Sequence, residues 1–295
     1  MSTVTSPVPD HLAGLVDDAA TFPPGNAPID EGVRAHAARH TEWYDALVAS
    51  YVVKDSDLGA TADAHASSGA TRSLRASVVL TTGAGGVAPA AALAARKGVE
   101  VHALETAVRD LDDPAGNVRR IAAAVDQARA EGDLAEDAKV FVELPPGDPT
   151  PGWLAAADEV SMSDLRLKLR TGGVEAHLFP TADQLAAWID AALDRELSFK
   201  CTAGLHNAVR HDDDGLPHHG FLNVLLATRR AFDGAARDEV VATLEQRDGG
   251  ALLAEVPDPA AEIAAARRWF TSFGSCSVLE PRDDLIALGL LEDPA

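Results

Sequence analysis

Residues 165–204 contain two short apolar runs, each followed by a turn that contains glycine, with a helical segment between them. The first run is Leu165-Arg166-Leu167-Lys168-Leu169-Arg170-Thr171-Gly172-Gly173, and the second is Leu197-Ser198-Phe199-Lys200-Cys201-Thr202-Ala203-Gly204. Residues 182–195, between the two runs, are rich in alanine and have apolar side chains at helical spacing. Two apolar strands joined by a crossover helix are typical of a parallel sheet covered by helices.

The same strand-and-helix pattern extends along the whole chain. We expect strands at residues 11–19, 50–54, 75–81, 99–105, 139–144, 165–170, 197–202 and 269–277. We expect helices at residues 29–48, 88–97, 117–131 and 182–195. Eight such units predict an α/β fold of the (β/α)8 TIM-barrel type. A doubly wound open sheet is the alternative, but it would gather polar residues at one switch point, whereas here they recur at the ends of most strands.

The sequence contains no Pro/Gly/Ser-rich linker that would divide it into domains and no internal repeat. Residues 1–295 are therefore predicted to form a single (β/α)8 barrel domain. The stretch 205–272 is too long for an ordinary crossover between the seventh and eighth strands. We expect this elaborated segment to hold a loop, two helices and an extra strand near residues 251–254, and to lie over the barrel mouth.

Composition limits the partners of the protein. The formal net charge is −21, and 46% of the residues are hydrophobic. This balance argues against nucleic acid and anionic membrane surfaces as partners and favours a small-molecule substrate. Two distant cysteines, Cys201 and Cys276, do not indicate a disulfide framework. Residues 1–10 lack the pattern of a signal peptide and no run of 18 apolar residues occurs, so a cytoplasmic protein is expected, with a homodimer compatible with this fold.

Lysine is scarce in this chain, with five residues against twenty arginines. Lys54, Lys168 and Lys200 nevertheless fall inside predicted strands. A lysine amine can lose its proton when desolvated and attack a carbonyl carbon, which a guanidinium cannot do. A buried lysine paired with a carboxylate explains the same placement, and the sequence leaves both interpretations open.

The sixth predicted strand carries a row of basic side chains. Arg166, Lys168 and Arg170 alternate with leucines, so all three share one face of the strand. Cations side by side in an interior are costly unless an anion or a carboxylate meets them. The pattern therefore predicts either an anionic ligand, such as a phosphate- or carboxylate-bearing carbonyl compound, or carboxylate partners from other strands.

The two runs resemble the class I aldolases of the deoxyribose-phosphate aldolase type. Lys168 with Thr171-Gly172-Gly173 is similar to the sixth-strand motif that carries the family's Schiff-base lysine, and Lys200 with Ala203-Gly204 is similar to the seventh-strand motif whose lysine tunes the first. Leu15-Val16-Asp17 resembles the family's first strand. Phe273-Gly274-Ser275-Cys276-Ser277 resembles the eighth-strand turn that holds the substrate phosphate. The resemblance implies a lyase in which Lys168 or Lys200 forms an imine, while Gly172, Gly173, Thr202, Gly204, Ser275 and Ser277 bind the substrate with Arg170.

Carboxylates end three of the predicted strands. Asp17, Glu105 and Glu143 are expected at the barrel mouth, where they would either transfer protons as acid and base or pair with the lysines. The sequence does not distinguish these two roles.

Four of the ten histidines lie in the loop after the seventh strand: His206, His211, His218 and His219. Contact with the substrate by His206, Arg210 or His219 is the favoured interpretation, with His206 as a proton shuttle. Asn223 is expected either to hydrogen-bond back into the site or only to satisfy a backbone group. No cofactor is assigned. A divalent metal held by these histidines with Glu105 or Glu143, in a metal-dependent hydrolase or lyase, stays open, as does a non-catalytic barrel that binds an anion.

Overall fold

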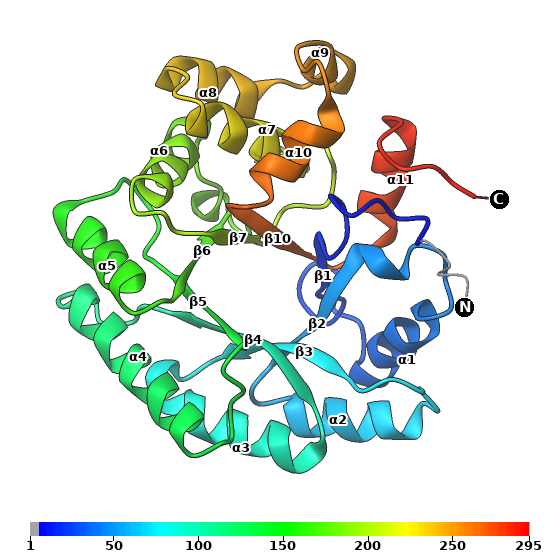
Figure 1. Cartoon of the computed structure of the whole chain (residues 1–295), viewed down its shortest axis with the longest axis vertical. Helices are drawn as coiled ribbons and strands as arrows, with labels where there is room; N and C mark the ends of the chain where they lie inside the picture. The colour runs from blue at the N-terminus through cyan, green and yellow to red at the C-terminus, as the bar shows by residue number, and fades with distance from the viewer. Residues whose placement is uncertain (1–5, 295) are drawn as a thin grey trace.

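The computed structural model describes residues 6–294 and shows eight parallel strands closed into a barrel (Figure 1). The strands follow one another around the barrel in the order β1-β10-β7-β6-β5-β4-β3-β2. Their bounds are β1 Val16–Asp18, β2 Val48–Lys54, β3 Arg75–Leu80, β4 Glu100–Ala107, β5 Lys139–Glu143, β6 Arg166–Arg170, β7 Phe199–Thr202 and β10 Phe270–Ser275. The predicted (β/α)8 barrel is thus confirmed.

Helices surround the barrel on the outside, as Figure 1 shows. They are α1 Ile29–Arg39, α2 Leu58–Ser67, α3 Val87–Lys97, α4 Pro114–Ala130, α5 Pro151–Met162, α6 Ala182–Leu193 and α11 Leu279–Ala287. Short 3-10 turns, η2 Gly83–Gly86 and η3 Ala176–Leu178, precede α3 and α6. Local sequence sets where several of them begin. Asp113 and Thr150 cap α4 and α5 immediately before a proline at the first helical position, and Thr181 forms a capping box with Gln184 at α6.

Two sequence predictions near the amino terminus were too long. The first strand covers only Val16–Asp18, because residues 9–14 form turns in which Leu12 N–H donates to the Pro9 carbonyl. The helix predicted over residues 29–48 ends at Arg39, and a 3-10 turn, η1 Asp45–Leu47, leads into β2. Each of the other seven strands begins and ends within two residues of its predicted bounds.

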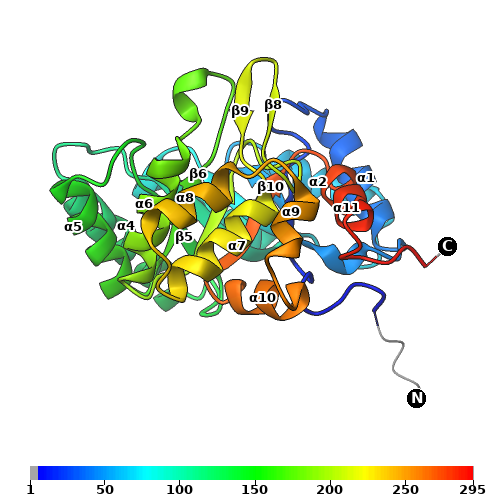
Figure 2. The ribbon, with the colours of Figure 1, turned by 90° about the horizontal axis from the view of Figure 1, so that it is seen from above.

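The segment between β7 and β10 has two parts. A hairpin of β8 His211–Asp213 and β9 Leu216–His218 projects above the barrel (Figure 2). Four helices follow on the barrel's outer side: α7 Phe221–Phe232, α8 Arg237–Glu245, α9 Gly249–Ala254 and α10 Pro259–Ala266. The strand predicted at residues 251–254 was wrong, because Asp248 accepts a hydrogen bond from Ala251 N–H and begins a helix there. Only the start of this segment, including the hairpin, lines the mouth.

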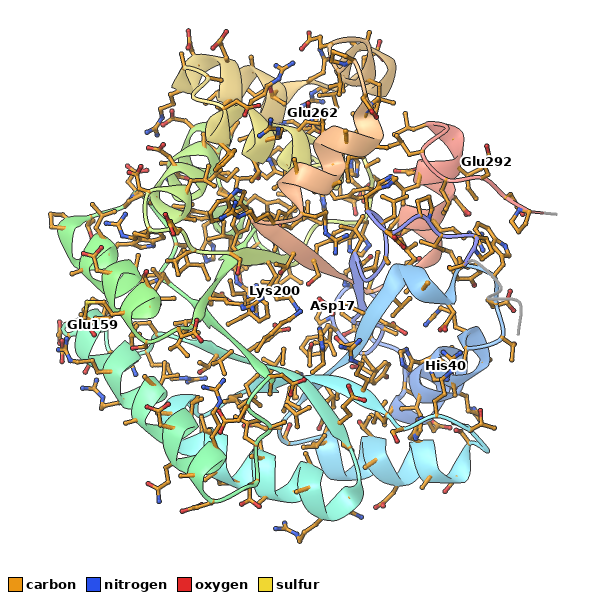
Figure 3. The ribbon with its side chains drawn as sticks, viewed as in Figure 1. Asp17, His40, Glu159, Lys200, Glu262 and Glu292 are labelled. Atoms are coloured by element: carbon orange, nitrogen blue, oxygen red, sulfur yellow. The ribbon has the colours of Figure 1, made fainter. Side chains whose placement is uncertain are left out.

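An aromatic cluster packs between the barrel and α7, and polar side chains occupy the barrel's centre. The rings of Phe199, Phe270, Phe273 and Phe221 stack in sequence at centroid distances of 5.5, 6.4 and 4.8 Å, which joins β7, β10 and α7. At the barrel's centre, Asp17 and Lys200 face one another (Figure 3). No helix among residues 6–294 is long and apolar enough to span a membrane.

Candidate active site

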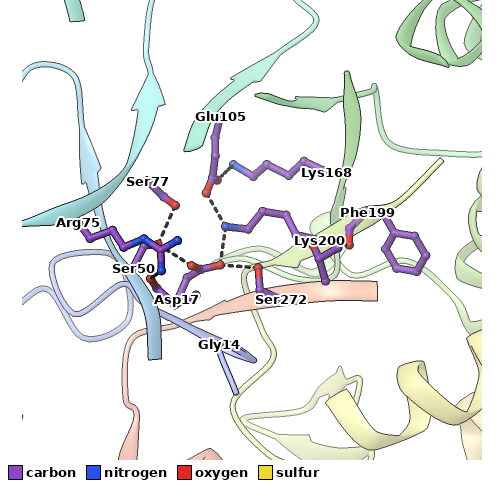
Figure 4. Close-up of polar contacts among 12 residues, drawn as sticks. Gly14, Asp17, Ser50, Arg75, Ser77, Glu105, Lys168, Phe199, Lys200 and Ser272 are labelled. Atoms are coloured by element: carbon purple, nitrogen blue, oxygen red, sulfur yellow. Dashed lines mark hydrogen bonds and ion pairs between the residues drawn. The ribbon is translucent and has the colours of Figure 1, made fainter. Parts of the chain in front are cut away.

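A chain of alternating charges crosses the inside of the barrel. Lys200 Nζ lies 2.7 Å from Asp17 Oδ2 and 2.5 Å from Glu105 Oε1, and Lys168 Nζ lies 2.9 Å from Glu105 Oε2 (Figure 4). Lys168 Nζ is also 3.3 Å from Glu143 Oε2, whose other oxygen accepts from Arg170 Nε at 2.7 Å. Three cations therefore meet three carboxylates. This arrangement supplies carboxylate partners for Lys168 and Arg170 of the basic sixth strand.

Strand register explains why these groups meet. Lys168 of β6 is directly opposite Lys200 of β7 and opposite Glu143 of β5 in the parallel ladder. Side chains at the same level of neighbouring strands lie on the same face, so the two amines and the carboxylate all point into the barrel. Glu105 reaches between the two amines from β4.

Three serine hydroxyls form a hydrogen-bond network around Asp17, at one end of this charge chain. Ser50 and Ser272 donate hydrogen bonds to Asp17 at 2.5 and 2.7 Å, and Ser77 lies 2.7 Å from Ser50 (Figure 4). All four side chains are buried. With Lys200 as a further donor, the Asp17 carboxylate is fully hydrogen-bonded and fixed in place.

Neighbouring charges keep the lysines and carboxylates of this charge chain ionised. Burial opposes the charge on Glu105, but the ammonium groups of Lys200 and Lys168 outweigh it and lower its pKa to about 2. Burial likewise opposes the charge on Glu143, while Lys168 and Arg170 lower its pKa. Burial disfavours the ammonium of Lys200, yet Asp17 and Glu105 raise its pKa above the ordinary value. Asp17 and Glu105 thus favour the protonated form of Lys200, which is the form that does not attack a carbonyl.

A cavity of about 720 Å³ opens at the carboxyl ends of the strands. Its floor includes Glu105, Lys168, Arg170 and Lys200. Its walls come from the turns after β1, β6, β7 and β10 and from the hairpin, and they include Phe22, Pro23, Pro24, Gly173, Leu178, Thr202, Ala203, Gly204, His206, His211, His218, Gly274, Cys276 and Ser277. Lys168 exposes 6% of its side chain and Lys200 2%, so Lys168 is the more accessible amine.

The turns after β6 and β7 touch one another at glycines. A side-chain carbon added to Gly204 would lie 3.1 Å from the Gly172 Cα, and Gly204 has a φ of +75°. Ala203, just before it, has a φ of +60°, which is uncommon for a residue with a side chain. Thr171 Oγ1 donates to the Ala203 carbonyl at 2.7 Å and holds the two turns together. Backbone edges of both turns can therefore approach a ligand closely.

His206, a predicted site residue in the loop after β7, meets Cys276 and Glu280, two partners that the sequence did not predict. His206 Nδ1 lies 2.9 Å from Glu280 Oε2, and both ring nitrogens lie 3.8 Å from Cys276 Sγ. Burial opposes the imidazolium, but Cys276 and Glu280 raise the pKa of His206. Ser275 is buried and donates to the Ser277 carbonyl at 2.6 Å, so it shapes the turn while Ser277 lines the cavity. Cys276 and Glu280 are separated from His206 by at least 70 residues, which explains why sequence spacing did not reveal them.

Arg210, His219 and Asn223 lie outside the lining of this cavity. His219 is fully buried, with Nε2 2.8 Å from the Pro180 carbonyl and Nδ1 3.0 Å from Arg210. Asn223 is also fully buried, and its amide donates to the carbonyls of Thr243 and Gln246 while it accepts from Arg210 N–H. In this structure the three residues hydrogen-bond at the base of the hairpin, and Asn223 satisfies backbone groups there.

The four histidines of this loop point to different partners. The rings of His211 and His218 stack at 5.2 Å, while His206 pairs with Glu280 and His219 is buried. Across residues 6–294, no three histidine, cysteine or carboxylate side chains are arranged to hold a metal ion. The described residues therefore do not form the metal site that was left open for this loop.

Two further strand-end residues lie apart from the charge chain. Lys54 is exposed and its ammonium stands 5.5 Å from the Phe22 ring centroid at the rim. Asp18 faces the outside of the barrel, where it pairs with Arg39 at 2.6 Å and His36 at 3.0 Å on α1. Asp17, its neighbour, is the one that enters the barrel.

Comparison with known proteins gives a likeness of fold. No protein-family model matches the chain, and no curated protein matches its sequence. Among solved structures, the deoxyribose phosphate aldolase of Aeropyrum pernix, described as having a unique tetrameric structure, is similar with a TM-score of 0.54. The alignment covers 94% of this chain and 92% of that chain at 13% identity. The likeness is thus one of fold, the (β/α)8 barrel.

Proposed function

We propose that this protein is a Schiff-base lyase of the aldolase type, acting on a small carbonyl compound that bears a phosphate or carboxylate, with Lys168 as the nucleophile. The observation that carries the proposal is the position of the two lysines. Both lysines border the mouth cavity, but Lys168 exposes 6% of its side chain and Lys200 only 2%, and Lys200 is held protonated between Asp17 and Glu105. The two amines therefore have different tasks.

Imine formation at Lys168 conserves the charge of the site. When the lysine ammonium condenses with a carbonyl group, the carbonyl oxygen leaves as water and the protonated imine keeps one positive charge on nitrogen. Glu105 and Glu143, at 2.9 and 3.3 Å from that nitrogen, would stabilise the iminium as they stabilise the ammonium. The attacking form needs a neutral amine, which forms by transient proton loss to water.

The low pKa of Glu105 and the lowered pKa of Glu143 make both carboxylates weak bases. We assign them to charge stabilisation at the nitrogen, and Asp17 to the support of Lys200. The iminium then withdraws electrons from the adjacent C–C bond as it breaks, which gives an enamine while the hydroxyl proton of the departing aldehyde passes to a base. His206 lines the same cavity and is the titratable group we assign to that proton transfer.

The anionic end of the substrate would bind between Arg170 and the turns after β7 and β10. Arg170 exposes 34% of its side chain, and Gly204, Gly274 and Ser277 line the same cavity. Backbone amides at strand ends and a guanidinium are common ligands of phosphate and carboxylate groups.

Borohydride trapping tests the proposal. Protein is incubated with small aldehydes and ketones that carry a phosphate or carboxylate, reduced, and weighed as the intact chain by mass spectrometry. We expect a stable adduct with at least one compound. Lys168→Arg is the matched control, because it keeps a cation between Glu105 and Glu143 but cannot form an imine. Absence of any adduct across the panel would refute the lyase.

The ion pairs around Lys168 also favour a second candidate, a non-catalytic barrel that binds an anionic carbonyl compound. A lysine between two carboxylates is satisfied without any reaction. In that case the ligand binds and is recovered unaltered, and Lys168→Arg binds it as tightly as the natural chain.

A further inference from the structure

A second cavity lies at the opposite end of the barrel, where the strands begin. Its volume is about 560 Å³, and Arg75, His102, Lys139 and Arg267 line it. Asp17 and Lys200 line it from the barrel interior, so Lys200 borders both cavities. Active sites of such barrels are built at the carboxyl ends of the strands, so this end has no part in the proposed lyase reaction.

Basic residues are concentrated at this end of the barrel. Arg75, Lys139 and Arg166 are the first residues of β3, β5 and β6, and His102 is the third residue of β4. Parallel strands of a barrel begin at one face, so these side chains form a ring of basic groups. The ring occurs in a protein of net charge −21, in which basic groups are outnumbered by acidic ones.

Counter-charges for this ring are few. Arg75 pairs with Glu100 at 3.0 Å, but neither Lys139 nor Arg166 has a carboxylate within ion-pair distance among residues 6–294. Arg267 donates to four backbone carbonyls, those of His11, Ala13, Gly14 and Thr271, and its Nε is buried without a hydrogen-bond partner in the described structure. Asp17, the carboxylate within the cavity, is already neutralised by Lys200.

The protein environment disfavours the charged forms of four basic groups at this end of the barrel: His102, Lys139, Arg166 and Arg267. Burial, and then the charge of Arg166, lower the pKa of Lys139, and burial with Arg75 and Lys139 lowers that of His102 to about 4, against the opposing effect of Asp17. Burial also lowers the pKa of Arg166, and that of Arg267 to about 10. Cations held together without a counter-ion are stabilised by a bound anion.

We propose that the cavity bounded by Arg75, His102, Lys139 and Arg267 is a binding site for a small polyvalent anion, such as phosphate or a short dicarboxylate. The cavity has room for a small metabolite. Arg75 of β3, Lys139 of β5 and Arg267 just before β10 face it as cations, and the His102 imidazole of β4 lies beside them. The bound anion would also act on Lys200, which gives an electrostatic connection to Glu105 and Lys168. The proposal of this anion site does not depend on the proposed lyase activity at the mouth of the barrel.

Nuclear magnetic resonance of the His102 imidazole tests this site, because His102 lines the second cavity and not the mouth. The full chain, labelled with ¹³C at its histidines, is titrated at constant pH with inorganic phosphate, with succinate, and with sodium chloride at matched ionic strength. The His102 signal is assigned by its loss in His102→Asn. We expect a saturable shift of this signal with phosphate or succinate, and the stronger of the two identifies the class of anion.

Two lysine variants complete the test. Lys139→Gln should raise the dissociation constant of the anion, measured from the His102 shift, by about tenfold, which corresponds to a loss of about 1.4 kcal/mol of binding free energy. Lys97→Gln removes an exposed lysine that pairs with Asp63, and it should leave the effect unchanged. Lys139→Gln should also raise the melting temperature without phosphate, because one uncompensated cation is gone. A His102 signal that follows ionic strength alone, or that shifts equally in Lys139→Gln, would overturn the proposal.

Discussion

Replacement of Glu105 by glutamine is the most informative perturbation of the charge chain. The side chain is about 2% exposed, and its two oxygens lie 2.5 Å from Lys200 Nζ and 2.9 Å from Lys168 Nζ. A carboxyl whose pKa falls from 4.5 to about 2 on folding stabilises the folded state by about 3 kcal/mol at neutral pH, since each tenfold change in proton affinity corresponds to about 1.4 kcal/mol. Glu105→Gln should therefore lower the free energy of unfolding by about 3 kcal/mol at pH 7.

Urea denaturation at several pH values measures this loss. Because the pKa of Glu105 is lower in the folded state, its contribution is complete above pH 4.5 and disappears as the pH falls toward about 2. The difference between the natural chain and Glu105→Gln should shrink over that range. Asp63→Asn, which breaks an exposed pair with Lys97, is the control and should cost less than about 1 kcal/mol. A loss at pH 7 no larger than that of the control, or one independent of pH, would refute the reasoning.

Three further predictions follow from the same site. Lys200→Met should destabilise the fold by about 3–5 kcal/mol, measured by urea denaturation, because it leaves Asp17 and Glu105 buried without their shared cation; a loss below about 1 kcal/mol would contradict the ion-pair geometry. Gly204→Ala should lower the melting temperature more than Gly215→Ala, since both positions have a φ near +75° but only Gly204 is crowded, by Gly172; equal losses would show that the contact is unimportant. Glu280→Gln should lower the pKa of His206 in a histidine titration. The pair stabilises the fold below about pH 6.5 and loses this effect as the pH rises through the raised pKa of His206, so the variant should lack this pH-dependent stability. An unchanged titration would show that Glu280 does not raise the pKa of His206.

The strands were predictable because each is a short apolar run that stands between glycine- or proline-containing turns. The failures occurred where local hydrogen bonds decide the structure. Asp248 begins a helix where apolar residues alone suggested a strand, and turns shorten β1 to Val16–Asp18. A single polar side chain at a cap can thus outweigh several residues of apolar pattern.

The candidate site was predictable only in part. The alternation of Arg166, Lys168 and Arg170 correctly placed their side chains on one face, but residues rise by about 3.3 Å each along a strand, so Arg166 lies about 13 Å from Arg170, at the opposite end of the barrel. The sequence also could not choose partners for the lysines. Lys200 meets Asp17 and Glu105 across 183 and 95 residues, and only the closed barrel brings them together.

The central claim is that the chain offers one reactive amine, that of Lys168. The most direct measurement is peptide mapping by mass spectrometry after borohydride reduction, which locates the trapped substrate on one of the five lysines. We predict that the added mass lies on Lys168 and is missing in Lys168→Arg. An adduct on Lys200, or one spread over the exposed lysines in proportion to their exposure, would contradict the account.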